Sequence, residues 1–284
     1  MSLLGPVLDK IIDTAILEDL GWGDVTTEIL VPRDLQAHGS FLMKSDGVLA
    51  GMDVGRAVFL RVDPSLVFTA LRQDGEAVKK GDVIATVKGN ARGILMAERT
   101  ALNFLQRLSG TATLTARFLE AVSGFKAKVS ETRKTTPGLR YLEKYAVRAG
   151  GGVNHRYHLG DGILIKDNHL AALRLAGVSL PEVIKKAKAG APHTLKVEVE
   201  VTSVEDAVTA AAAGADIILL DNMSLDQMRK AVQAVGGRAM LEASGGITLE
   251  NARKIAETGV DIMSAGALTH SAKALDISLE LQYE

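Results

Sequence analysis

The pattern of hydrophobic and polar residues changes character along the chain. Apolar residues recur at helical spacing between positions 8 and 20, before Gly21 and Gly23, and predict an amphipathic helix. Short alternating segments then follow between 37 and 87, separated by Asp-Gly and Lys-Gly-Asp turns. They predict strands at 38–43, 47–51, 66–71 and 83–87, and therefore a small, open, β-rich domain.

A long helical pattern over 94–122 leads into alternating strands and helices. Strands are predicted at 128–132, 162–166, 195–201, 216–221, 239–243 and 261–264, and helices at 139–149, 204–213, 224–235 and 249–258. The last four strand ends, Val201, Asp221, Ala243 and Ser264, are 20, 22 and 21 residues apart, the length of a βα unit with short loops. This regularity favours a parallel α/β barrel, and a doubly wound sheet is the alternative.

Composition narrows the class of function. The 284 residues carry 33 Lys and Arg against 34 Asp and Glu, so no global charge attracts nucleic acid or an anionic membrane. The absence of Cys excludes disulfides, thiolate metal sites and a cysteine nucleophile, and fits a reducing cytoplasm. Because no signal peptide or membrane-spanning apolar run is visible, we expect a soluble, cytoplasmic protein.

In a parallel barrel the active site lies at the carboxyl ends of the strands, because the βα loops converge there. The glycine loops at the last two predicted strand ends can direct backbone N–H groups at a phosphate, although such glycines also occur in plain tight turns. In chain order the strand ends carry cations, then carboxylates, then these loops: Thr132-Arg133-Lys134, Lys166, Glu200, Asp221-Asn222, Ser244-Gly245-Gly246 and Ala265-Gly266-Ala267.

Two glutamates share one face of the strand predicted at 195–201. Glu198 and Glu200 alternate with valines, and only Glu200 lies near the carboxyl end. Asp221 ends the next strand and should be its neighbour. Such a pair of carboxylates suits a transition state that develops positive charge on a sugar. The alternative is that the glutamates pair with Lys196 or another structural cation.

Basic residues are concentrated between 131 and 169. Arg133 and Lys134 follow a predicted strand, and His155 and Arg156 follow a glycine turn. These positions suit binding of carboxylates and pyrophosphate, because Arg binds planar carboxylates bidentately. The basic residues on the helix 139–149 are instead expected to form a solvated face, since they are four positions apart: Arg140, Lys144 and Arg148.

Nine motifs in order resemble the quinolinate phosphoribosyltransferases of NAD synthesis. They are EDLGWGDVTT (18–27), ERTALNFLQRLSG (98–110), TRKTTPG (132–138), GGVNHR (151–156), LIKDNH (164–169), EVE (198–200), LDN (220–222), EASGG (242–246) and GALTH (266–270). The resemblance implies transfer of the phosphoribosyl group of phosphoribosyl pyrophosphate (PRPP) to quinolinate with decarboxylation. It also implies an α/β protein with an irregular parallel α/β barrel over 111–271 and an N-terminal open-faced α+β sandwich over 1–110, to which the tail 272–284 returns.

The resemblance also implies how the site residues divide the work. Glu200 and Asp221 would hold the ribose hydroxyls and the Mg2+ that accompanies PRPP. Lys134 and Lys166 would face the pyrophosphate and the reacting centre, beside Thr132. Quinolinate would be bound by Arg133, His155 and Arg156, with Arg99 from a partner subunit, and the 5′-phosphate by Ser244, Gly245, Gly246, Ala265, Gly266, Ala267 and His270.

An arginine supplied in trans requires at least a homodimer, and a hexamer of dimers is equally compatible. Two rivals share the fold: a nicotinate-type transferase that does not decarboxylate, and the molybdenum-transport accessory proteins. A rival from another class is a non-catalytic sensor of phosphosugars. The number of basic residues favours a dicarboxylate, and the pair Glu200 and Asp221 favours catalysis over sensing.

Overall fold

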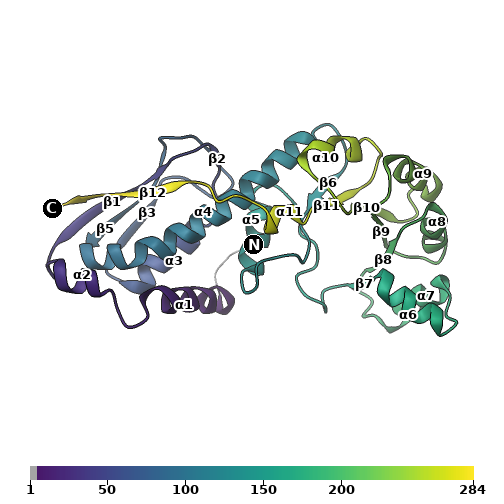
Figure 1. The fold of residues 1–284 in the computed structure, drawn as a ribbon, viewed down its shortest axis with the longest axis horizontal. Helices are drawn as coiled ribbons and strands as arrows, with labels where there is room; N and C mark the ends of the chain where they lie inside the picture. Colours follow the sequence, from purple (N-terminus) through teal and green to yellow (C-terminus); the bar gives the residue numbers. More distant parts are fainter. Residues whose placement is uncertain (1–4) are drawn as a thin grey trace. The chain divides into compact units, whose positions relative to one another are not determined.

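The computed structural model describes residues 5–284, which form two compact units (Figure 1). The first unit comprises the chain up to Ala116 together with Thr135–Gly151 and Ser271–Glu284, and the second comprises Arg117–Lys134 and Gly152–His270. The sequence did not indicate that Thr135–Gly151 belongs with the first unit. The boundaries 1–110, 111–271 and 272–284 stay a prediction, and residues 1–4 of that range lie outside the described residues.

An antiparallel sheet organises the first unit. Its strand order is β12-β1-β5-β3, from β12 (Ile277–Tyr283), β1 (Gln36–Met43), β5 (Val83–Asn90) and β3 (Val67–Ala70). A second, two-stranded sheet pairs β2 (Gly47–Val48) with β4 (Ala77–Val78). The helices of this unit are α1 (Pro6–Leu20), α2 (Val25–Leu30), α3 (Met52–Val62), most of α4 (Ala91–Ala121) and α5 (Arg140–Ala149).

The core of the first unit lies between this sheet and its helices. Alternate residues of β1 are buried, as the alternating sequence pattern predicts. Phe41 of β1 packs edge-on against Phe59 of α3, with ring centroids 5.6 Å apart, and against Phe68 of β3 at 5.5 Å. The sheet, covered by helices, matches the open-faced arrangement that the resemblance implied (Figure 1).

Two sequence predictions in the first unit are wrong. The strand predicted at 47–51 ends at Val48. Gly51 is instead the N-cap residue of α3, in a left-handed conformation, and Asp74 accepts the N–H groups of Gly51 and Met52. Lys144 is fully buried and does not belong to a solvated face of α5. The neighbouring Glu143 is buried too and pairs with Arg107, so α5 is an internal helix of this unit.

The second unit is a parallel sheet with the strand order β6-β11-β10-β9-β8-β7. From β7 onwards neighbours in the chain are neighbours in the sheet, and β6 pairs with the last strand, β11. A doubly wound sheet reverses its strand order near the middle. The barrel-like arrangement is therefore confirmed, and Val153 extends it beyond β6 through a parallel bridge to Ser130.

The strands of this unit are short and most are followed by helices. The strands are β6 (Lys128–Ser130), β7 (Ile163–Ile165), β8 (Val197–Val201), β9 (Ile217–Asp221), β10 (Met240–Ser244) and β11 (Ile262–Ser264). The helices are α6 (Asp167–Leu175), α7 (Leu180–Gly190), α8 (Val204–Ala212), α9 (Leu225–Val235), α10 (Leu249–Ala256) and α11 (Ala267–His270).

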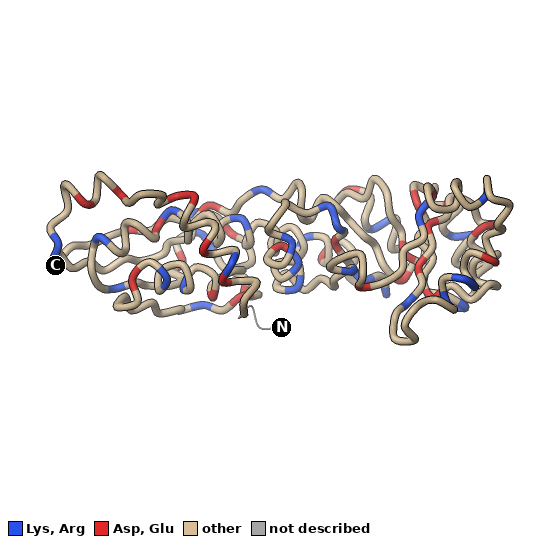
Figure 2. The backbone as a smooth tube through the Cα atoms, turned by 90° about the horizontal axis from the view of Figure 1, so that it is seen from below, with Lys and Arg blue, Asp and Glu red and all other residues tan. Residues whose placement is uncertain are grey.

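Charges of both signs are interspersed along the backbone of each unit (Figure 2). This distribution agrees with the balance of 33 basic and 34 acidic residues in the sequence. No helix within residues 5–284 combines the length and apolar character needed to cross a membrane. The charges that matter for function must therefore be sought locally, at the strand ends.

Candidate active site at the carboxyl ends of the parallel strands

The predicted carboxylates meet at the edge where the parallel strands end. Glu200 lies near the end of β8 and Asp221 ends β9, next to Ser244 of β10 in the register of the sheet. Burial raises the pKa of Glu200, and the negative charges of Asp221 and Asp167 raise it further, although Lys166 acts in the opposite direction. The edge thus holds an unneutralised group of carboxylates.

The alternative pairing with Lys196 does not occur. The Nζ atom of Lys196 lies 3.8 Å from the sulfur of Met240, and its charge acts on Asp216 at the other end of the sheet. Glu200 is consequently not part of a structural ion pair with Lys196. Its half-buried carboxylate is available for a ligand with positive charge.

Asn222 orients Asp221, a role that the sequence did not indicate. Its side-chain Nδ2 donates to Asp221 Oδ2 at 2.8 Å, and its backbone N–H donates to the carbonyl of Ser244 at 3.0 Å. Among residues 5–284 it is the only non-glycine residue with a positive φ, 50°. A side chain at Gly245 would collide with the Asn222 amide, so glycine is required there by close approach. Backbone strain of this kind is common at functional sites.

Lys134 and His270 are brought together beside Gly266. A Cβ atom at Gly266 would lie 3.0 Å from His270 Nε2 and 3.1 Å from Lys134 Cδ. The backbone carbonyl of Lys134 accepts a hydrogen bond from the Thr269 hydroxyl at 2.7 Å, and Thr132 Oγ1 accepts from the Lys134 N–H at 3.0 Å. The ends of β6 and β11 therefore present two basic side chains around a glycine, an arrangement suited to phosphate.

Arg133 and Arg156 form the second basic group. Burial lowers the pKa of Arg156, and the positive charge of Arg133 lowers it further. Each has a buried Nε atom without a hydrogen-bond partner among the described residues. Arg156 Nη1 donates to the carbonyl of Gly162 at 3.0 Å, which fixes one side of its guanidinium. The remaining donors favour an anionic ligand.

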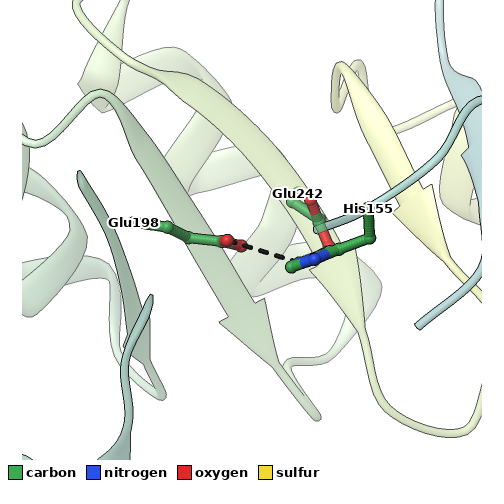
Figure 3. Close-up of side chains that lie close together, drawn as sticks. All are labelled: His155, Glu198 and Glu242. Carbon is green, nitrogen blue, oxygen red and sulfur yellow. Dashed lines mark ion pairs between the residues drawn. The ribbon is translucent and has the colours of Figure 1, made fainter. Parts of the chain in front are cut away.

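The turn that carries Arg156 is held by a buried carboxylate that the sequence did not single out. Glu131 is fully buried; its Oε2 accepts from Asn154 Nδ2 and its Oε1 from the His155 N–H, each at 3.0 Å. The His155 ring points inward, with Nε2 3.3 Å from Glu198 Oε2 and 3.7 Å from Glu242 Oε1 (Figure 3). A cavity of about 440 Å³ is lined in part by His155, Arg156, Glu198 and Glu242.

Other predicted site residues are less constrained. Lys166 precedes α6 as an exposed residue, and Arg99 is an exposed residue of α4 in the first unit. Ser244 and Gly245 are half-buried, and Gly246 is exposed in a left-handed conformation, φ 59°. Ala265 is buried, and its N–H donates to the Ser130 carbonyl at 2.9 Å, while Ala267 begins α11.

The pH dependence of stability should report on Glu242. Burial raises the pKa of this carboxyl from 4.5 to about 7, and the charge of Glu198 adds to the effect. The native state therefore holds this proton more tightly than the unfolded chain, and the resulting stability is lost as the pH rises from about 4.5 through about 7. Glu242→Gln keeps the group neutral, so it should raise the melting temperature at pH 8 by a few degrees and have little effect at pH 5.

Thermal unfolding at the two pH values measures this difference. Glu120→Gln is the control, because Glu120 is exposed and its replacement should have the same small effect at both pH values. Equal melting temperatures of wild type and Glu242→Gln at pH 8 would contradict the raised pKa.

Two family models match the chain. Quinolinate phosphoribosyl transferase, N-terminal domain, matches residues 24–109, and the C-terminal domain of the same family matches residues 111–280. Together they cover most of the sequence and both units.

Individual relatives agree over most of their length. The nicotinate-nucleotide pyrophosphorylase (carboxylating) of Mycobacterium leprae is 47% identical over 274 residues, 94% of each chain. A mitochondrial quinolinate phosphoribosyltransferase (decarboxylating) of Nicotiana tabacum is 41% identical over 98% of this chain and 83% of its own. The crystal structure of NadC from Streptococcus pyogenes superimposes with a TM-score of 0.94 at 43% identity and full coverage of both chains. The chain therefore belongs to the quinolinate phosphoribosyltransferase family.

Proposed function

We propose that the chain transfers the phosphoribosyl group of PRPP to quinolinate and releases pyrophosphate and carbon dioxide to give nicotinate mononucleotide. The observation that carries this assignment is that Arg133 and Arg156 each have a buried Nε atom without a hydrogen-bond partner among the described residues. Two guanidinium groups suit a ligand with two carboxylates, because each guanidinium can bind one carboxylate bidentately. His155 contributes through the same turn, and Arg99 is assigned to the same substrate from a partner subunit.

Glu200 and Asp221 are assigned to the ribose and to Mg2+. Their fit to a hard cation follows from the pKa of Glu200, which is raised by burial and then by the charges of Asp221 and Asp167. Carboxylate oxygens are the ligands that Mg2+ prefers, and a bound cation would relieve this repulsion. When bound with PRPP, Mg2+ neutralises charge on the departing pyrophosphate.

The protein groups can support a single displacement followed by decarboxylation. Glu200 and Asp221 stabilise the positive charge that develops on the ribose as pyrophosphate leaves towards Lys134 and Lys166. The pyridine nitrogen of quinolinate forms the new bond to ribose C1 and becomes cationic. This positive charge stabilises the electron pair that remains on the adjacent ring carbon when the neighbouring carboxylate departs as carbon dioxide. A proton from solvent then forms the new C–H bond at that carbon. No covalent intermediate with the enzyme is required.

The glycine loops are assigned to the 5′-phosphate of PRPP. The loop after β10 contains two glycines with positive φ, and α10 follows it, so backbone N–H groups and a helix N-terminus can face the same anion. On the neighbouring strand end, His270 adds a side chain beside Gly266. The residues assigned to this phosphate are Ser244, Gly245, Gly246, Ala265, Gly266, Ala267 and His270.

We infer that the active form is at least a homodimer that places Arg99 in the partner's site. Arg99 is exposed on α4. Large apolar side chains on α1, α2 and the turn between them are exposed to an extent unusual for an isolated surface and suit a second copy of the chain: Leu17 (71%), Trp22 (106%), Val25 (68%), Ile29 (74%) and Leu30 (73%). A hexamer of dimers would satisfy the same requirement.

Mixing two inactive variants tests the contribution in trans. Arg99→Ala and Glu200→Ala should each be nearly inactive alone, whereas mixed dimers of the two variants should regain about half of wild-type turnover, since each has one intact site of two. The measurement is turnover per subunit after co-purification with two different tags. Mixed dimers as inactive as the separate variants would place Arg99 in the site of its own chain.

The activity itself is tested with purified protein, PRPP and Mg2+, with quinolinate or nicotinate as the acceptor. We expect nicotinate mononucleotide from quinolinate alone, with one carbon dioxide for each nucleotide and loss of turnover on chelation of Mg2+. Product from nicotinate would reassign the acceptor. Product from neither would support the accessory or sensor alternatives.

A further inference from the structure

The ring of His155 makes its contacts inside the protein. Its Nδ1 accepts a hydrogen bond from the backbone N–H of Arg156 at 2.8 Å. An accepting ring nitrogen carries no proton, so the proton of the neutral imidazole lies on Nε2. This Nε2–H points at two carboxylates, Glu198 Oε2 at 3.3 Å and Glu242 Oε1 at 3.7 Å (Figure 3).

Both carboxylates are deeply buried and incompletely paired. The side chains of Glu198 and Glu242 are 7% and 3% exposed, and the Oε1 atom of each is without a hydrogen-bond partner among the described residues. Burial of such groups costs desolvation free energy, and packing contacts alone do not compensate for it. Neither residue is used in the displacement or the decarboxylation, so their presence beside His155 calls for another role.

A metal centre is the first alternative, because His155, Glu198 and Glu242 offer ligand atoms within 4.8 Å of one another. A metal ion bound at Nε2 would require the ring proton to move to Nδ1. There it would face the Arg156 N–H, which now donates to Nδ1. The arrangement is therefore suited to orienting the imidazole by hydrogen bonds and not to coordinating a metal ion.

The orientation of this ring is transmitted to Arg156. On one side of the turn, Glu131 fixes the backbone of His155 and the side chain of Asn154. On the other side, the His155 ring holds the backbone N–H of Arg156. The buried Nε of the Arg156 guanidinium has no hydrogen-bond partner among the described residues. A rotation of the imidazole would release the Arg156 amide and change where its guanidinium points.

We propose that Glu198 and Glu242 are positioning residues of the acceptor site. Glu198 Oε2 accepts the hydrogen bond of His155 Nε2–H and the charge of Glu242 attracts the same N–H, so that the ring holds the Arg156 backbone and the guanidinium faces the substrate carboxylate. The identity of that substrate rests on the proposed function. The orientation of the His155 ring does not depend on the proposed function, and it can be measured without turnover.

Steady-state kinetics test the effect on substrate. Glu198→Leu removes the acceptor and Glu242→Leu removes the second carboxylate beside the ring. For each we expect the KM for quinolinate to rise about tenfold or more while the KM for PRPP changes less than about twofold. Glu242→Gln and Glu198→Gln keep an amide oxygen and should lie closer to wild type. The control Val199→Ala removes buried volume from the same strand and should leave the ratio of the two KM values unchanged.

Equal rises in both KM values for Glu242→Leu and Glu242→Gln would overturn the proposal, because loss of packing alone would explain them. Thermal unfolding identifies variants that do not fold. If the leucine variants fail to fold, the comparison of Glu242→Gln and the double variant Glu198→Gln/Glu242→Gln with wild type still decides: stepwise increases in quinolinate KM alone support positioning, and wild-type values overturn it.

Nitrogen NMR of histidine-labelled protein measures the ring directly, with His155 assigned through His155→Gln. We expect a single Nε2–H tautomer in wild type without substrate, and averaging of the two tautomers in Glu198→Leu, which removes the acceptor. A proton on Nδ1, or a spectrum that changes on chelation or addition of Zn2+, would overturn the proposal in favour of a metal site. A fixed Nε2–H tautomer in a protein that makes no nucleotide would overturn the proposed function and leave the orientation of His155 supported.

Discussion

Replacing Glu200 by Gln or Asp221 by Asn should lower kcat by about three orders of magnitude while quinolinate still binds. One carboxylate about 4 Å from a developing charge contributes on the order of 4 kcal/mol at an effective dielectric constant near 20. Since that charge exists on the ribose only in the transition state, the loss should fall on kcat and not on quinolinate affinity. Rapid-quench turnover and equilibrium binding of quinolinate measure the two effects separately.

A matched control is Asp226→Asn, because the Asp226 side chain on α9 is 83% exposed and should be dispensable. Asn222→Ala is informative as well. It removes the donor to Asp221 Oδ2 and leaves a non-glycine residue with positive φ, so we expect a smaller fall in kcat than for Asp221→Asn. A folded Glu200→Gln protein that no longer binds quinolinate would refute the separation of the acceptor site from the ribose site.

Replacing Arg156 by Lys should raise the KM for quinolinate about 30- to 100-fold, although the positive charge is retained. Lys cannot reproduce a bidentate contact, and loss of a charge-assisted hydrogen bond between buried partners costs about 2–3 kcal/mol. The KM for PRPP should change little. Initial rates with each substrate varied in turn provide the two values.

Arg148→Lys is the control, since Arg148 is exposed on α5. The double variant Arg133→Lys/Arg156→Lys should lose less quinolinate binding free energy than the sum of the two single losses. Once one substrate carboxylate is unbound, the other is already held less firmly. Additive losses would mean that the two guanidinium groups act on separate ligands.

Much of the second unit could be predicted because its short, largely buried strands alternate with helices at intervals of about 20 residues. The predicted bounds of β8, β9 and β10 differ from the observed bounds by at most two residues. The predicted first residues of α8, α9 and α10 lie within the same margin. In parallel sheets the residues that follow such strands meet at one edge, so Glu200, Asp221 and the glycine loops could be identified from their positions alone.

Other elements depend on contacts that are distant in sequence. The helix α3 begins where Asp74 accepts the N–H groups of Gly51 and Met52, a cap that no local pattern reveals. The helix α6 has a single buried residue, Leu170, so its apolar signal is weak. The predicted exposure of Lys144 is wrong because residue spacing shows which side chains share a helix face, but not whether other elements cover that face.

The positioning groups of the site were missed for the same reason. Glu131 follows β6 and Glu242 lies in β10, whereas the turn at 154–156, which their side chains approach, comes after α5. Asn222 was noted only as the neighbour of Asp221, and its role depends on the close approach of Gly245. Sequence periodicity locates the strand ends, whereas the groups that aim the side chains depend on which strands become neighbours.

The position of β12 has a consequence for biosynthesis. This strand pairs along the whole of β1, yet the ribosome makes it only after the second unit has been translated. Until then the nascent sheet has three strands, and β1 presents an unpaired edge to which other chains can add. Chaperone protection should therefore matter most during the interval between synthesis of β1 and release of residues 277–283. The second unit can complete its fold first, although the first unit begins to be translated earlier.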